Sequence, residues 1–134
     1  MTHPNIELVA RLFTAFASGD SEAIASGMSP EIRWHSSGFD GTAGDYVGIP
    51  AVLAYLHGED HAPQTQMRVL DILASHDRAA LVARTSASDG TRSLDDHWVL
   101  LLHLVDGVVD EAWTYKWDQR AWAAFLPADD GRAP

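Results

Sequence analysis

The dipeptide Asp106-Gly107 constrains the fold of this chain more than any other feature, because it lies between two apolar runs. Asp-Gly suits the two-residue turn of a β-hairpin. Pairing outward from this turn sets Leu100 opposite Trp113 and Trp98 opposite Tyr115. Residues that face each other across two strands lie on the same face of the sheet. The predicted hairpin therefore carries an aromatic patch, formed by Trp98, Trp113, Tyr115 and Trp117, with Asp96 and Glu111 at its ends.

This aromatic patch has two interpretations: it lines a pocket for an apolar ligand, or it joins two proteins. The register of the hairpin decides which side chains face inward, because a slip by one residue moves every side chain of a strand to the other face. A slip would place a different set inside, namely His97, Val99, Leu101, His103, Thr114 and Lys116.

Three helices are expected before the long strands. Apolar residues recur at helical spacing in three segments, and capping residues, prolines or glycines mark the ends of these segments. The segments are Ile6 to Phe16, ended by Gly19; Asp20 to about Met28, ended by Ser29-Pro30; and Pro50 to Gly58.

The second half of the chain is rich in expected strands. The strands are predicted over residues 32–36, 66–74, 79–87, 92–105 and 108–117, and a short helix over 118–125. Helices followed by an antiparallel sheet give an α+β fold. The length favours one domain, over residues 1–126, followed by a flexible tail at 127–134.

The run from Trp98 to Leu102 is apolar at every position. An antiparallel strand normally keeps one face in water, so this run predicts a strand covered on both faces. The helices can cover only one face. A second subunit is expected on the other, which predicts a homodimer.

The segment 37–48, between the first strand and the third helix, is rich in glycine and carries Tyr46. Loops of this length inside a compact domain often serve as lids or binding loops. The alternative, a surface loop without a role, stays open.

The net charge of this chain indicates which classes of partner it is expected to avoid. A formal net charge of −10 disfavours nucleic acid, because an acidic surface repels phosphates. The sequence has no cysteine, no apolar run long enough to span a bilayer and no basic, apolar leader. We therefore expect a cytoplasmic protein with neither nucleic acid nor a membrane as partner.

Four stretches of this sequence resemble the SnoaL-like branch of the NTF2-like superfamily, which also contains ketosteroid isomerases and limonene epoxide hydrolases. The resemblance covers about residues 5–126 and is carried by residues 12–20, 33–36, 43–48 and 106–113, together with Asp118-Gln119. It implies an α+β cone, in which three N-terminal helices pack on a curved, mostly antiparallel sheet and enclose an apolar pocket. It implies no cofactor. The ligand-binding residues that the resemblance and the pairing imply are Trp34, Ser36, Tyr46, Trp98, Leu100, Trp113 and Trp117.

The sequence departs from the catalytic patterns of these relatives. The resemblance places the base of the ketosteroid isomerases near Ser36 and their oxyanion-hole residues near Leu12 and Leu100. The cyclases' inward His and Asp fall at Leu100 and at Thr114 or Tyr115. Each known apparatus is therefore missing at its expected place.

Asp96 and Tyr115 are the candidates for catalysis. A carboxyl group against indole rings is poorly solvated, which makes it a usable acid or base near neutral pH. Tyr115 could donate a hydrogen bond to a ligand carbonyl. The alternatives are a solvated Asp96 at a strand start and a packed Tyr115.

The histidines give weaker signals. His35 should point away from the pocket if Trp34 points into it. His103 lies across from Asp110, which suits either an oriented base or a structural hydrogen bond. His57 and His61 have metal-ligand spacing, but no third ligand is evident, and no metal site is predicted.

The sequence thus predicts a protein that binds a small apolar or aromatic molecule. If it is an enzyme, cofactor-free acid–base chemistry of the isomerase, cyclase, dehydratase or epoxide hydrolase type is expected. Two alternatives remain open: a non-catalytic carrier or sensor, and a dimeric interaction module.

Overall fold

The computed structural model of the protein describes residues 3–58 and 66–126. Four helices and six strands lie within these residues. They are α1 (Pro4–Ser18), α2 (Ser21–Ser26), β1 (Met28–Ser36), β2 (Gly44–Val47), α3 (Ile49–Gly58), β3 (Gln66–Ala74), β4 (Arg78–Ser88), β5 (Ser93–Val105), β6 (Val108–Lys116) and α4 (Gln119–Phe125). The expected tail 127–134 and the side chains of His57 and His61 lie outside what the structure describes.

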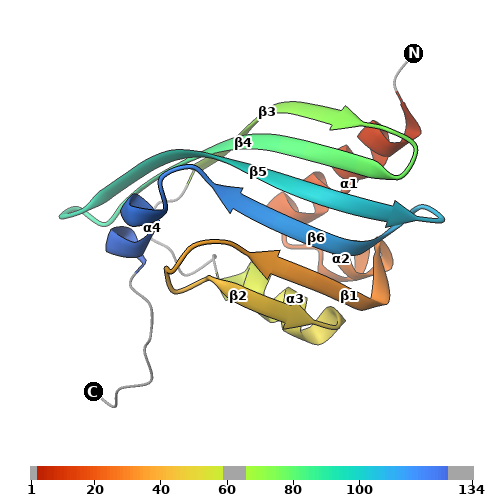
Figure 1. Ribbon diagram of the computed structural model, residues 1–134, viewed down its shortest axis with the longest axis horizontal. Helices are drawn as coiled ribbons and strands as arrows, with labels where there is room; N and C mark the ends of the chain where they lie inside the picture. Colours follow the sequence, from red (N-terminus) through yellow and green to blue (C-terminus); the bar gives the residue numbers. More distant parts are fainter. Residues whose placement is uncertain (1–2, 59–65, 127–134) are drawn as a thin grey trace.

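The strands form one curved sheet in the order β2-β1-β6-β5-β4-β3. β1 and β6 are parallel, and the other neighbouring strands are antiparallel. Helices α1, α2 and α3 lie on one face of the sheet, and α4 lies beyond the end of β6 (Figure 1). We call the face toward α1, α2 and α3 the inner face and the opposite one the outer face. The predicted α+β cone is confirmed. In the described part of the chain, no helix is long and apolar enough to cross a membrane.

The helix ends follow from local chemistry. Gly19 ends α1 with a φ of 71°, a left-handed conformation that glycine adopts without strain. The Asp20 side chain accepts a hydrogen bond from the backbone N–H of Ala23 and so caps α2. The prediction that α2 reaches Met28 was wrong, because Gly27 caps the helix and β1 begins at Met28.

Pro30 therefore lies within β1 and does not precede it. Between Met28 and Arg33 the register of β1 with β6 shifts, so this part of the strand is irregular. Such irregular positions tolerate proline, which has no N–H to donate to a neighbouring strand. The second half of the loop predicted over 37–48 is also not a loop, because Gly44–Val47 forms β2 and pairs with Arg33–Ser36 of β1.

The β5–β6 hairpin holds the main correction. Val105 pairs with Val108 and Leu104 with Val109, as the Asp106-Gly107 turn predicts. The next pair is His103 with Glu111, so Asp110 is an extra residue in β6. This one-residue β-bulge advances the rest of β6 by one position.

The bulge breaks up the predicted aromatic patch. Leu100 lies opposite Thr114 and not Trp113, and Trp98 lies opposite Lys116 and not Tyr115. The inward residues of β5 are those expected, but β6 turns Ala112, Thr114 and Lys116 inward. The proposed alternative register was therefore right for β6 and wrong for β5.

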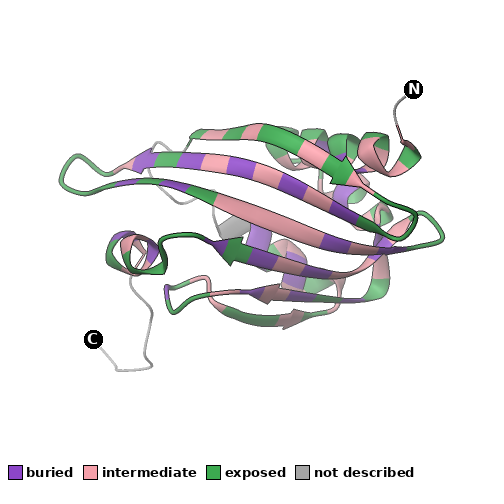
Figure 2. Ribbon diagram, turned by 45° about the horizontal axis from the view of Figure 1, so that its top comes forward, coloured by how far each residue is buried: buried purple, intermediate pink, exposed green. Residues whose placement is uncertain are grey.

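The hydrophobic core lies between the inner face and the helices. Its most deeply buried members come from both layers: Val9, Ile32, Val52, Leu81 and Val109. Buried residues alternate with more exposed ones along β4, as the two-residue period of a strand requires (Figure 2). The packed layers leave one large space between them, which is the candidate site.

Candidate functional site

A cavity of about 290 Å³ lies between the inner face and the helices. This volume is close to the lower limit of small-molecule sites, about 300 Å³. Its wall is mostly apolar and includes Phe13 and Phe16 of α1, Trp34, Trp98 and Leu100 of the sheet, and Trp122 and Phe125 of α4.

Three residues predicted to bind a ligand, Trp34, Trp98 and Leu100, line this cavity. Two others lie directly behind its wall. Ser36 is buried and accepts a hydrogen bond from Lys116 Nζ. Tyr46 packs on Tyr55, with ring centroids 4.5 Å apart, and its hydroxyl donates to the carbonyl oxygen of Thr42.

The other aromatic candidates do not line the cavity. Trp113 and Tyr115 lie on the outer face, because the bulge at Asp110 reverses the direction of their side chains. Trp117 follows β6 and is 86% exposed. The prediction that these three side chains face the pocket was wrong. Because Tyr115 points away from the cavity, the prediction that it donates a hydrogen bond to a ligand there was wrong as well.

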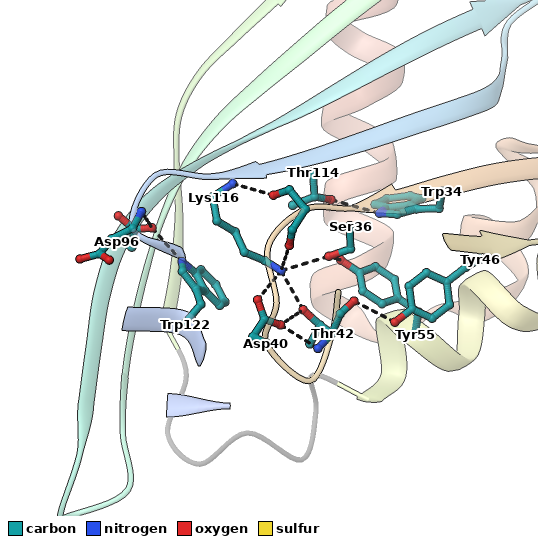
Figure 3. A network of polar contacts seen from close by, with 12 residues as sticks. Trp34, Ser36, Asp40, Thr42, Tyr46, Tyr55, Asp96, Thr114, Lys116 and Trp122 are labelled. Atoms are coloured by element: carbon teal, nitrogen blue, oxygen red, sulfur yellow. Dashed lines mark hydrogen bonds and ion pairs between the residues drawn. The ribbon is translucent and has the colours of Figure 1, made fainter. Parts of the chain in front are cut away.

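Asp96 is buried on the inner face, but its neighbour is Trp122 and not Trp117. One oxygen, Oδ2, accepts hydrogen bonds from Trp122 Nε1 at 2.8 Å and from the backbone N–H of Asp118 at 2.9 Å. These two bonds hold the start of α4 against β5 (Figure 3). The sequence suggested either an Asp96 at the pocket mouth beside Trp117 or a solvated Asp96. Neither describes the buried, hydrogen-bonded side chain.

The polar cluster of the cavity was not predicted. Its centre is Lys116, whose ammonium donates to Asp40 Oδ2 at 2.7 Å, the Ser37 carbonyl at 2.9 Å, Thr42 Oγ1 at 2.9 Å and Ser36 Oγ at 3.1 Å. Figure 3 shows Ser36, Asp40 and Thr42 around the end of the lysine side chain. The side chains of Lys116 and Asp40 are 3% and 0% exposed. Of this group, Lys116 and Thr42 line the cavity.

The charged groups of this cluster find their hydrogen-bond partners within the protein. An ammonium has three protons, and four oxygens accept from Lys116. Asp40 Oδ1 also accepts from the backbone N–H and the hydroxyl of Thr42. The cluster therefore ties the loop 37–43 to the end of β6, and its two charges cancel at the cavity wall.

One signal could have found Lys116. It is the single lysine of the sequence, whereas every other basic side chain is arginine. A compact ammonium with three rotatable donors fits a small pocket of oxygens better than a planar guanidinium does. Nothing in the sequence pairs it with Asp40, which lies 76 residues earlier.

The described histidines of the sheet lie on the outer face. His103 Nδ1 is 2.6 Å from Asp110 Oδ1, which confirms the predicted pair. His35 points away from the pocket, as expected, and stacks on Trp113. Its two ring nitrogens each lie 2.7 Å from a carboxylate oxygen, of Asp45 and of Glu111. These bonds, first with Asp45 and then with Glu111, raise the pKa of His35 above 6.5.

This raised pKa predicts a pH-dependent stability. A proton that the folded state holds more tightly stabilises the protein fully below the unfolded pKa, about 6.5, and the effect is lost as the pH rises through the folded value. We expect the wild type to exceed a His35→Gln variant in urea midpoint at pH 6, and the difference to shrink steadily toward pH 9. A difference that stays constant over this range would contradict the prediction.

Comparison with known proteins places the geometry in context. A family model described as SnoaL-like domain matches residues 9–112. Uncharacterized protein Rv0034 of Mycobacterium tuberculosis is 27% identical over 124 residues, which cover 90% of this chain and 95% of that protein.

Two solved structures are similar over nearly their whole length. Bal32a from a soil-derived mobile gene cassette has a TM-score of 0.84 at 27% identity, covering 91% of this chain and 95% of its own. An NTF2-like protein from Burkholderia xenovorans has a TM-score of 0.78 at 21% identity, with coverages of 91% and 95%. The second likeness shows the fold alone.

Proposed function

The chain belongs to the SnoaL-like domain family, and from this premise we propose that it binds a small, neutral, apolar or aromatic molecule in the cavity between sheet and helices. One observation carries the proposal. The cavity wall is apolar, and its lysine, Lys116, already has its counter-ion in Asp40.

The paired lysine argues for a neutral ligand. An anion entering the cavity would leave water and find no uncompensated positive charge, because Asp40 cancels that of Lys116. A buried charge without a partner is costly, whereas an apolar molecule gains from leaving water. The cavity should therefore discriminate against carboxylates and sulfonates of the same shape.

We propose binding as the function, with acid–base catalysis as the alternative. In the described part of the cavity wall no carboxyl or imidazole group is present. Asp96 uses Oδ2 to hold α4, and Asp40 is committed to Lys116 and Thr42. These commitments favour a carrier or sensor over an isomerase, cyclase, dehydratase or epoxide hydrolase.

Two fluorescent probes with the same anilinonaphthalene ring system, one neutral and one charged, test the proposal. N-phenyl-1-naphthylamine is neutral, and 8-anilinonaphthalene-1-sulfonate adds one negative charge. We expect the neutral probe to bind about tenfold more tightly or better. Asp40→Asn should narrow this gap, because it leaves the charge of Lys116 without its counter-ion. Equal affinities for both probes would overturn the proposed neutrality.

A pair of substitutions in β5 locates the bound probe. Leu100→Trp fills the cavity, whereas Val105→Trp adds the same side chain at an exposed position at the end of the same strand. We expect the first variant to lose at least about tenfold in affinity for N-phenyl-1-naphthylamine and the second to bind like the wild type. Equal binding by both variants would place the probe outside the cavity.

We also propose that the outer face packs against a second copy of this chain. Val99, Leu101 and Trp113 form an apolar centre on it, in line with the doubly apolar run of β5. Arginines and carboxylates are near balance around this centre: Arg33, Arg68, Arg78 and Arg84 against Asp45, Asp71, Asp95, Asp110 and Glu111.

The balance of charge supports a second copy as the occupant. The chain carries a net charge of −10, so two copies repel one another over most of their surfaces. The outer face gathers four of the nine lysine and arginine residues and so weakens this repulsion locally. We expect analytical ultracentrifugation to show a dimer and Tyr115→Arg, at a half-exposed site, to yield monomers. A monomeric wild type would refute the dimer.

A further inference from the structure

Besides Thr42 and Lys116, two further threonines interrupt the apolar wall of the cavity with their hydroxyl groups. Thr85 of β4 and Thr114 of β6 both line it and are 3% and 7% exposed. Neither belongs to the set of atoms around Lys116 Nζ. A buried hydroxyl without its full hydrogen bonds is costly, so the partners of each group have to be accounted for.

Each hydroxyl oxygen accepts a hydrogen bond from a tryptophan. Trp98 Nε1 donates to Thr85 Oγ1 at 2.8 Å, and Trp34 Nε1 donates to Thr114 Oγ1 at 3.1 Å. An indole nitrogen can only donate, so the hydroxyl proton cannot be used in the same contact. Among residues 3–56 and 66–126, neither hydroxyl donates to an acceptor. Each threonine therefore keeps one proton available to a molecule in the cavity.

The sheet places these two donors apart. Thr85 lies opposite Asp96 and Thr114 opposite Leu100, on either side of the β5 strand that carries both partners. From strand spacing and rise, their Cα atoms are about 16 Å apart in a flat sheet, and curvature brings the inward side chains closer. Trp98 lies between them, so the wall between the donors is apolar.

We propose that Thr85 and Thr114 are the two hydrogen-bond donors to the ligand. The ligand is then an elongated, neutral molecule with an apolar middle and an acceptor oxygen, such as that of a ketone or an ester, toward each end. This inference deepens the proposed function and rests on it. Each tryptophan holds the oxygen of its threonine through a hydrogen bond from a neutral indole N–H. The hydroxyl proton of the threonine is thereby left for the ligand, and no charge is added to the cavity wall.

A series of three probes tests the inference: biphenyl, 4-acetylbiphenyl and 4,4′-diacetylbiphenyl, each measured by displacement of N-phenyl-1-naphthylamine. We expect affinity to rise about threefold to tenfold with each acetyl group, the gain from one hydrogen bond. Within each variant, Thr85→Val and Thr114→Val should lower the affinity of 4,4′-diacetylbiphenyl relative to biphenyl by one such gain. Thr85→Ser and Thr114→Ser keep the hydroxyl and should retain the gains.

The outcomes separate the two proposals. If all three compounds bind equally, or if the valine variants keep the gains of the wild type, the two threonines are not the ligand's donors although the cavity binds apolar molecules. If none of the compounds displaces the fluorescent probe, the proposed function fails together with this inference. Because the probe series also gives a result on the wild type alone, a valine variant that folds poorly leaves the test intact.

Discussion

Replacing Lys116 by Met is expected to lower the free energy of unfolding by about 3–5 kcal/mol, because it leaves the Asp40 carboxylate buried without its cation. The two hydrogen bonds from Thr42 remain, but they do not cancel the charge. The loop 37–43 also loses the hydrogen bonds that it accepts from the Lys116 ammonium, while the bonds of Ser37 with the β6 backbone remain. Urea unfolding followed by circular dichroism measures the loss.

Two controls isolate the charge from the packing. The double variant Lys116→Met, Asp40→Asn has no buried charge and should recover most of the stability, since a buried ion pair is often replaceable by neutral groups. Arg84→Met breaks the ion pair of Arg84 with Asp95, which is exposed on the outer face, and should change stability little. If the double variant is no more stable than the single one, the loss is one of packing.

Replacing Asp96 by Leu is expected to cost about 2–5 kcal/mol, because the backbone N–H of Asp118 and the indole N–H of Trp122 both lose their acceptor. The effect should be largest in α4, which these bonds hold in place. Urea unfolding measures the total, and hydrogen exchange of the amides in 119–125 measures the local part. Unchanged exchange in α4 would contradict this account.

Asp96→Asn and Asp95→Leu are the matched controls for this position. Asparagine keeps a carbonyl acceptor, so most of the stability should remain. Asp95 is the preceding residue of β5, but it faces outward and is half-exposed, so its loss should matter little. Asp96→Asn also decides the catalytic alternative. If Asp96 transfers a proton, turnover of a true substrate disappears in this variant while binding persists.

The sequence predicts the elements and the inner side of β5 well. Glycine and proline punctuation and helical spacing place α1 and α3, and Asp106-Gly107 places the final hairpin. These signals are local, so the sequence states them directly. Trp98 and Leu100 face the cavity because their strand keeps its two-residue period without interruption.

The sequence leaves the inner side of β6 open between two registers, and it cannot decide between them for a physical reason. A bulge at Asp110 depends on how the neighbouring strands twist and pair, and Val109-Asp110-Glu111 gives no local sign of it. Trp113, Tyr115 and Trp117 attract attention as aromatics, yet the bulge turns the modest residues Thr114 and Lys116 into the cavity. The partner of Lys116 comes from a distant loop, which no spacing rule reaches.

The single buried lysine gives this protein an unusual chemical surface. Reagents that acylate amines meet no side-chain amine in this sequence other than Lys116, which folding encloses almost completely. The folded chain should consequently pass through lysine-directed labelling, crosslinking or enzymatic acylation unmarked at its side chains. A modification found on Lys116 would have been added while its ammonium was exposed, either before folding or during an opening of the cluster around it.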